Sequence, residues 1–126
     1  MSAGSATSPE RPWPEEIRLR EQGKVLSVSF DNGEHHDLSA EFLRVESPSA
    51  EVKGHGPGQE ITVAGKRNVT ISRVEPVGNY AVRLVFSDGH STGLYSWDYL
   101  VKLGRERDTL WAAYLERLKQ QGLSRD

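Results

Sequence analysis

Hydrophobic and polar residues alternate in the first third of the chain, a pattern typical of β-strands that bury one face. Between residues 17 and 30 the apolar positions are Ile17, Leu19, Leu26, Val28 and Phe30. The polar segment 21–24 separates two such runs, so the pattern predicts a β-hairpin. The Asp-Asn-Gly segment 31–33 tolerates positive φ, and a third strand returns to Leu38. We therefore expect a three-stranded antiparallel meander.

A short helix is expected directly after this meander. Ser39 is a favourable N-cap, and Glu41 in the first turn complements the helix dipole. The apolar side of the helix is formed by Phe42, Leu43 and Val45. Pro48 ends the helix, and the many glycines and prolines of residues 47–60 predict a long irregular loop.

A second hairpin is expected after the loop. Its strands contain the alternating runs 69–72 and 82–86, with a turn at residues 78–79. Residues 30–43 also resemble residues 86–100: in both, a strand turns at a glycine, returns, and reaches a serine with an acidic residue two positions on. Shared local physics explains this weak repeat as well as a duplication does.

A helical segment completes the predicted fold. We expect it to begin at Ser96, to pause at Gly104 as a C-cap, and to end at Gly122. Its apolar positions recur at helical spacing: Leu110, Trp111, Tyr114, Leu115 and Leu118. The expected fold class is α+β: a two-layer sandwich of an antiparallel β-sheet of hairpins, with a short helix after the first meander and the C-terminal helical segment packed on one face.

Composition indicates one small domain. Among the 126 residues we expect a disordered tail at 1–12, a single domain at 13–121 and a short polar tail at 122–126. The 16 basic and 18 acidic residues leave a net charge of −2, which argues against a nucleic-acid partner. No apolar run is long enough for a membrane span or a signal peptide, so we expect a cytoplasmic protein with no membrane association.

The chain contains no cysteine, which excludes disulfides, thiolate zinc sites and iron–sulfur clusters held by this chain alone. His35 and Asp37 have the His-x-Asp spacing of two ligands in a non-haem iron site, but no third ligand is evident. A role for His55 as acid or base lacks an oriented partner. We therefore expect no enzymatic activity.

The loop is the candidate binding region of the sequence. Its candidate residues are Glu46, Ser47, Ser49, Glu51, Lys53, His55 and Gln59. Lys53 and the loop glycines could bind an anion, although bending the chain explains the glycines and prolines equally well. A divalent metal would accept the oxygen and nitrogen atoms of Glu46, Glu51, His55 and His90, but their spacing is not diagnostic.

Four segments taken together resemble a known family: residues 43–52, 54–59, 86–90 and 96–100. In that order they are similar to the gamma-butyrobetaine hydroxylase-like N-terminal domain family, in its short stand-alone bacterial form. The resemblance covers about residues 13–118. In larger eukaryotic members this domain precedes an iron- and 2-oxoglutarate-dependent dioxygenase domain, so the resemblance implies an accessory domain without the catalytic one.

The resemblance also implies the fate of a metal site. Those hydroxylases hold a structural zinc with three cysteines and a histidine, and the matching positions here are Ser47, Ser49, Val52 and His90. Hydroxyls are poor neutral zinc ligands and valine has no donor atom, so we expect the zinc site to be lost. His90 then either hydrogen-bonds to Ser47 or Ser49, or joins Glu46, Glu51 or His55 in a weaker metal site.

Two functions follow from these observations. The leading one is a non-catalytic accessory or interaction domain without a cofactor, which binds another protein through residues 47–59 and His90. Similar segments are attached to iron–sulfur carrier ATPases of the Mrp type, which makes such an ATPase a candidate partner. The alternative is a metal-binding protein that holds zinc or iron and is linked to iron–sulfur cluster handling. The oligomeric state stays open.

Overall fold

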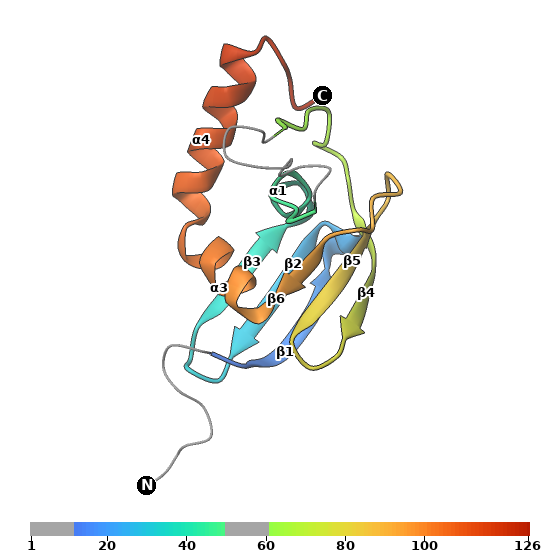
Figure 1. The fold of residues 1–126 in the computed structure, drawn as a ribbon, viewed down its shortest axis with the longest axis vertical. Coiled ribbons are helices and arrows are strands. Elements are labelled where there is room, and N and C mark those ends of the chain that lie inside the picture. Colours follow the sequence, from blue (N-terminus) through green and yellow to red (C-terminus); the bar gives the residue numbers. More distant parts are fainter. Residues whose placement is uncertain (1–11, 50–60) are drawn as a thin grey trace, which may run out of the picture.

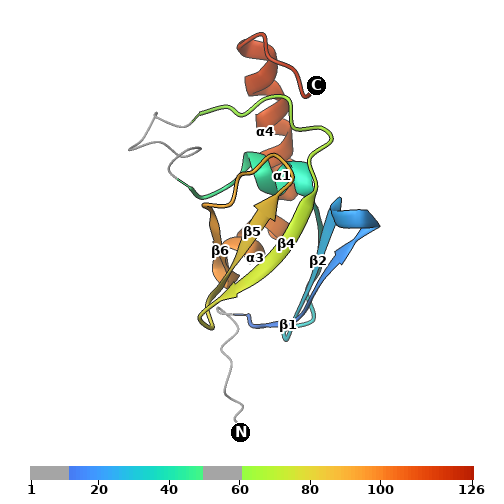
Figure 2. The same ribbon diagram turned by 90° about the vertical axis from the view of Figure 1, so that its right-hand side faces the viewer.

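The computed structural model describes residues 12–49 and 61–126, which form two three-stranded antiparallel sheets and three helices. Figure 1 shows how these elements are arranged. Both sheets, helix α1 (Ala40–Val45) and helix α3 (Trp97–Arg105) contribute to one hydrophobic core. Helix α3 lies beside the sheets, whereas helix α4 (Arg107–Gln120) extends beyond their end next to α1, as the two perpendicular views show (Figure 2). The expected α+β class is confirmed, with the strands divided between two small sheets.

The first sheet is the predicted meander. It contains β1 (Pro14–Arg20), β2 (Val25–Phe30) and β3 (His35–Ser39) in the order β1-β2-β3, and α1 (Ala40–Val45) follows at once. A short 3-10 turn, η1 (Glu21–Gly23), joins β1 to β2. Gly23 has φ +89°, and a Cβ there would lie 2.5 Å from the carbonyl oxygen of Ile71. Only glycine therefore permits this close approach of the first turn to the second sheet.

The second sheet repeats this arrangement. It contains β4 (Ile71–Val77), β5 (Ala81–Phe86) and β6 (Leu94–Ser96) in the order β4-β5-β6. Helix α3 (Trp97–Arg105) follows at once, and α4 (Arg107–Gln120) comes after it. The weak internal repeat thus corresponds to two meanders, each of which leads into a helix.

Both helices that follow a meander begin at the predicted serine cap. The backbone N–H of Phe42 donates to Ser39 Oγ at 3.1 Å, and that of Tyr99 donates to Ser96 Oγ at 3.1 Å. Each serine thereby satisfies one of the N–H groups that a helix start leaves without an intrahelical partner.

The core lies between the two sheets and the helices. Its largest fully buried side chains include Tyr95, Tyr114, Phe30, Phe42 and Phe86. A smaller cluster of Val45, Tyr114 and Leu118 packs α4 against the end of α1. No helix in residues 12–49 or 61–126 has both the length and the apolar character that crossing a membrane requires.

The predicted helix break at Gly104 is wrong by two residues. Gly104 lies inside α3, and the break falls at Glu106. A Cβ at Gly104 would lie 2.5 Å from Cδ2 of His36, so the glycine is needed for close packing of α3 on β3. The sequence shows the glycine but not the imidazole that faces it.

The last residues of the chain pack against other parts of the protein. The backbone N–H groups of Gly65 and Arg67 donate to the carbonyls of Ser124 and Arg125, both at 2.9 Å. Arg67 also pairs with Asp126 through Nε at 2.5 Å. These contacts align residues 65–67 with the C-terminal segment.

Candidate functional site

Ser47, Ser49 and His90 form a buried polar cluster where the end of α1 meets the turn after β5. His90 Nε2 lies 2.9 Å from Ser47 Oγ and 3.4 Å from Ser49 Oγ. Ser47 Oγ donates to Ser49 Oγ at 3.3 Å. Ser47 is fully buried and His90 is only 7% exposed. The predicted hydrogen bond between His90 and these serines is therefore present.

The backbone around this cluster is held by two tyrosines. The Tyr95 hydroxyl donates to the carbonyl of Leu43 at 2.6 Å, and the Tyr99 hydroxyl donates to the carbonyl of Glu46. Burial raises the pKa of both phenols, and the carboxylate of Glu46 raises that of Tyr99 further. Both tyrosines therefore stay protonated and act as donors that fasten the end of α1 to β6 and α3.

Gly93 gives the cluster its space. A Cβ at this position would collide with Ser47 Oγ and would also press on the Pro48 ring at 3.2 Å. The segment that leads into β6 can therefore pass directly over Ser47 only because residue 93 is glycine.

Asp88 organises the turn that carries His90. Its Oδ1 accepts from the backbone N–H of His90 at 3.1 Å, while Oδ2 accepts from Arg44 Nε at 2.8 Å and from Lys66 Nζ at 2.6 Å. Burial alone would raise the pKa of Asp88, but these hydrogen bonds outweigh it and lower the pKa to about 2. Asp88 is thus ionised at neutral pH and joins α1, Lys66 and the turn.

A shallow pocket of about 280 Å³ opens beside the cluster and is lined by Arg44, Lys66, Asp88, His90 and Ser91, among others. Arg44 Nη1 is buried and has no hydrogen-bond partner among the described residues. With two cations against one aspartate, the pocket favours an acceptor or an acidic group.

The other predicted site residues have different outcomes. Glu46 is buried next to the cluster, and Arg117 Nη2 lies 3.9 Å from its Oε2. The remaining loop candidates lie outside the described residues, and they are Glu51, Lys53, His55 and Gln59. His35 and Asp37 are exposed and pair with each other, with Nε2 and Oδ1 3.0 Å apart. This pairing gives the His-x-Asp pattern a structural explanation.

The cluster does not fit a tetrahedral zinc site. Of the four matching positions only His90 carries a good zinc ligand atom, and that atom is hydrogen-bonded to the serine hydroxyls. Within residues 12–49 and 61–126 no three His, Asp or Glu side chains gather as a metal would require. The metal hypothesis that uses Glu51 or His55 stays a prediction, since both residues lie outside that range.

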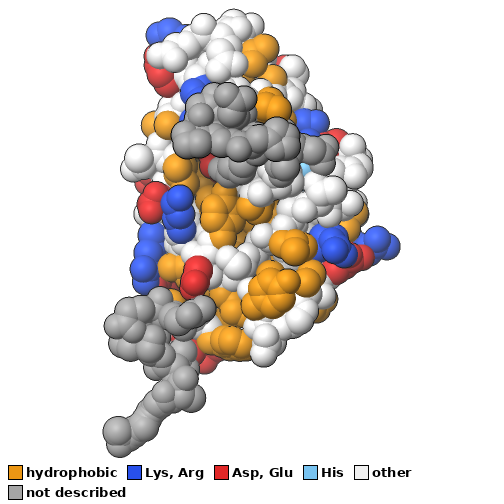
Figure 3. Space-filling view, viewed as in Figure 1, with side chains coloured by type: hydrophobic (Ala, Val, Ile, Leu, Met, Phe, Trp, Pro, Cys, Tyr) orange, Lys and Arg blue, Asp and Glu red, His pale blue; other side chains and the backbone are white. Residues whose placement is uncertain are grey.

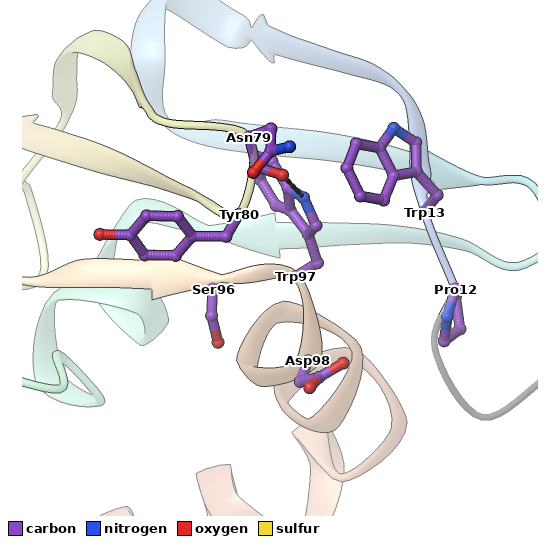
Figure 4. A pocket seen from close by; sticks show the side chains of 7 residues that line it. All are labelled: Pro12, Trp13, Asn79, Tyr80, Ser96, Trp97 and Asp98. Atoms are coloured by element: carbon purple, nitrogen blue, oxygen red, sulfur yellow. Dashed lines mark hydrogen bonds between the residues drawn. The ribbon is translucent and has the colours of Figure 1, made fainter. Parts of the chain in front are cut away.

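Sequence reasoning missed a second pocket, of about 330 Å³, at the opposite end of β5 (Figure 4). Its lining includes Pro12, Trp13, Asn79, Tyr80, Trp97 and Asp98. Trp97 also packs against the hydrophobic core and is only partly buried. The available signal was the position of each aromatic residue, since Trp13, Tyr80 and Trp97 all lie at a turn or at the end of an element.

The fold and the polar cluster together define a class of small α+β domain in which a histidine after β5 is bound to serines after α1. The chain belongs to the family described as gamma-butyrobetaine hydroxylase-like, N-terminal, whose model matches residues 17–101. This confirms the resemblance seen in the sequence. No curated protein matches the chain.

Solved structures are similar over nearly the whole chain. Two proteins with NMR solution structures have 47% and 48% sequence identity, each with a TM-score of 0.79. The alignments cover 92% and 97% of this chain and 91% of each of those chains. A crystal structure from Acidithiobacillus ferrooxidans, of a DUF971 family protein of unknown function, has 40% identity and a TM-score of 0.63. That alignment covers 78% of this chain and 98% of the other.

Proposed function

We propose that this chain is a non-catalytic interaction domain that binds another protein through residues 47–59 and the adjoining turn around His90. The observation that supports this proposal most directly is the buried contact of His90 with Ser47 and Ser49. These hydrogen bonds fix the start of the segment next to the turn after β5. The residues at the family's zinc-ligand positions thus act as an anchor that holds the start of the binding segment in place.

The charged pocket beside the anchor supports the same role. Arg44 and Lys66 both approach Asp88, and the buried Nη1 of Arg44 still lacks an acceptor in the described part of the chain. A partner that supplies a carboxylate or a carbonyl to this pocket would meet the positive charges of Arg44 and Lys66. The proposed partner surface is therefore acidic where it meets this turn.

The proposed partner is an iron–sulfur carrier ATPase of the Mrp type. The chain has no cysteine, so it cannot hold a cluster through thiolates of its own. Its contribution to cluster handling would consist of docking to the protein that carries the cluster. Docking requires only the anchored surface described above.

Calorimetric titration with a purified carrier ATPase of this type tests the proposal. Ser91→Glu adds a negative charge to the pocket lining, repels an acidic partner and should weaken binding at least tenfold. His55→Ala should weaken binding while leaving the melting temperature unchanged. Thr109→Glu, a matched substitution at an exposed position of α4, should bind like the unmodified protein. Absence of binding, or equal weakening by both glutamate variants, would contradict the proposed surface.

The metal-binding alternative has one supporting observation, the convergence of His90 Nε2 with two hydroxyl oxygens. Protein purified without a histidine tag should be titrated with zinc and with ferrous iron. Binding tighter than millimolar that is lost in His90→Ala, with the fold intact by circular dichroism, would favour this alternative over the interaction domain.

A further inference from the structure

Ser29, His35 and Asp37 form a chain of hydrogen bonds on the outer face of the first sheet. Ser29 Oγ lies 2.9 Å from His35 Nδ1, and His35 Nε2 lies 3.0 Å from Asp37 Oδ1. Ser29 lies directly opposite His35 in the register of β2 and β3, so the sheet itself brings the two side chains together. A hydroxyl, an imidazole and a carboxylate joined in this order form the arrangement of nucleophile, base and orienting acid that acyl transfer uses.

The protonation states of the three groups follow from their contacts. The hydrogen bond from Ser27 lowers the pKa of Asp37, and the neighbouring His35 lowers it further. An ionised carboxylate can only accept, so the proton of the neutral His35 ring lies on Nε2. Nδ1 is then the acceptor for the Ser29 hydroxyl. In this state the imidazole is oriented to remove the hydroxyl proton.

The chain of hydrogen bonds is open to solvent. The side chains of His35 and Asp37 are both 51% exposed. In Figure 2 the two sheets stand side by side, and the apolar side chains of the first sheet, such as Leu26, belong to the core on its other face. Figure 3 shows the side of the second sheet, where hydrophobic side chains gather over β6 and the β4–β5 turn. A reagent therefore reaches Ser29 from a polar face that is separate from this apolar one.

The position of Ser29 in the sheet restricts the class of reagent. Strand β2 is the central strand, and Ser29 is paired with Glu16 of β1 on one side and with His35 of β3 on the other. The backbone N–H groups of a central strand are committed to its two neighbours, so those of β2 cannot form an oxyanion hole. The acyl group must therefore arrive already activated by a good leaving group.

We propose that Ser29 is a nucleophile that accepts the acyl group of an activated donor, such as an acyl phosphate or a thioester. Ser29 Oγ attacks the carbonyl carbon while His35 Nδ1 takes the hydroxyl proton. The bond to the leaving group then breaks, and the leaving group departs with the electron pair and receives the proton from His35. An ester bond joins the acyl group to Ser29. This modification goes beyond the proposed protein interaction and involves neither residues 47–59 nor His90, so either proposal can fail without the other.

Peptide mapping by mass spectrometry tests the proposal in the full chain. The protein is incubated separately with acetyl phosphate and with acetyl-coenzyme A, and the acetylation of each serine is followed over time. Ser29 should be acetylated at least about tenfold faster than Ser72, an exposed serine of β4 in the other sheet. The donor that reacts shows whether the leaving group is a phosphate or a thiol. Equal rates at Ser29 and Ser72, or no acetylation of Ser29 by either donor, would overturn the proposal.

Variants of the histidine and the aspartate separate an activated serine from one that is merely exposed. His35→Gln keeps a polar side chain but removes the base, so acetylation of Ser29 should slow at least about tenfold. Asp37→Asn should slow it about threefold or more, and Asp37→Glu should restore part of the rate. Asp108→Asn is the matched control, because Asp108 lines the same small pocket as Asp37 while both ring nitrogens of His35 are bonded elsewhere. An unchanged rate in His35→Gln, with the fold intact by circular dichroism, would overturn the proposal.

Discussion

Glu41 accepts two hydrogen bonds from Arg125, each of 2.8 Å, so the C-terminal segment is tied to the first turn of α1. The Glu41 side chain is only 7% exposed, and the Arg125 guanidinium also lies 5.2 Å from the centre of the Trp111 ring. This pair joins two residues that are 84 positions apart in the sequence.

Replacement of Arg125 by alanine should therefore cost more than an ordinary surface substitution. The buried carboxylate of Glu41 would lose its partner, and we expect a loss of about 1–3 kcal/mol in the free energy of unfolding. Arg73→Ala, which removes an exposed ion pair with Glu75, should change stability by less than about 0.5 kcal/mol. Urea denaturation of both variants measures the difference. Equal effects would show that the C-terminal contact contributes nothing.

The effect of Gly104→Ala on stability should have opposite signs in the presence and absence of the His36 ring. Alanine is favoured over glycine in a helix by about 1 kcal/mol, but its Cβ would collide with the His36 ring, and overpacking costs about 1–3 kcal/mol. Gly104→Ala should therefore destabilise the protein. In a His36→Ala background the ring is absent, so the same change should stabilise by about 1 kcal/mol. Thermal unfolding of the four proteins completes this double-mutant cycle, and additive effects would contradict the packing explanation.

Asp88 should make the protein sensitive to acid. Its pKa is lowered to about 2 in the folded state, so its contribution is present in full above the ordinary pKa of 3.8 and is lost as the pH falls toward 2. The loss amounts to about 2 kcal/mol from this group. The Asp88→Asn variant should be less stable than the unmodified protein at neutral pH. Its free energy of unfolding should also fall less between about pH 4 and about pH 2. Asp108→Asn, at a fully solvated carboxylate, should retain the acid profile of the unmodified protein.

Cysteines at the matching positions should create a metal site. In the triple variant Ser47→Cys, Ser49→Cys and Val52→Cys, three thiolates would join His90, and the first two would lie where hydroxyls already contact Nε2. We expect cobalt to give the absorption of a tetrahedral thiolate complex and zinc to raise the melting temperature. The unmodified protein should show neither response. A variant that folds but does not bind cobalt would mean that the resemblance does not extend to the geometry of these positions.

Local patterns in the sequence predicted the elements well. The alternation at residues 17–30 and 82–86 identified the strands, and Ser39 and Ser96 were correctly assigned as caps. These features depend on residues that are close in sequence, where spacing carries the information. The chain order of the elements follows from them.

Contacts between distant segments could not be predicted in the same way. The role of Gly104 depends on His36, and the aromatic pocket depends on three segments that only the fold brings together. The His90 contact was the exception, because the resemblance to a family with a metal site placed it next to Ser47 and Ser49. Residues that match two ligands of one metal must lie close together in space, and neither composition nor hydrophobic periodicity gives that information.

The division of the strands into two sheets leaves outer strands that could recruit further chains. In the described part of the chain, β1, β3, β4 and β6 are outer strands. Of these, β1 and β4 have a shift in register near one end, at Pro14/Glu16 and at Ile71/Arg73. The shifts face Phe30 and Phe86, which are equivalent positions of the repeat. Such irregularities, together with charged residues along both strands, obstruct edge-to-edge pairing between molecules. The two equivalent edges at β1 and β4 are thus protected against pairing with other molecules, and partners are not expected to add a strand there.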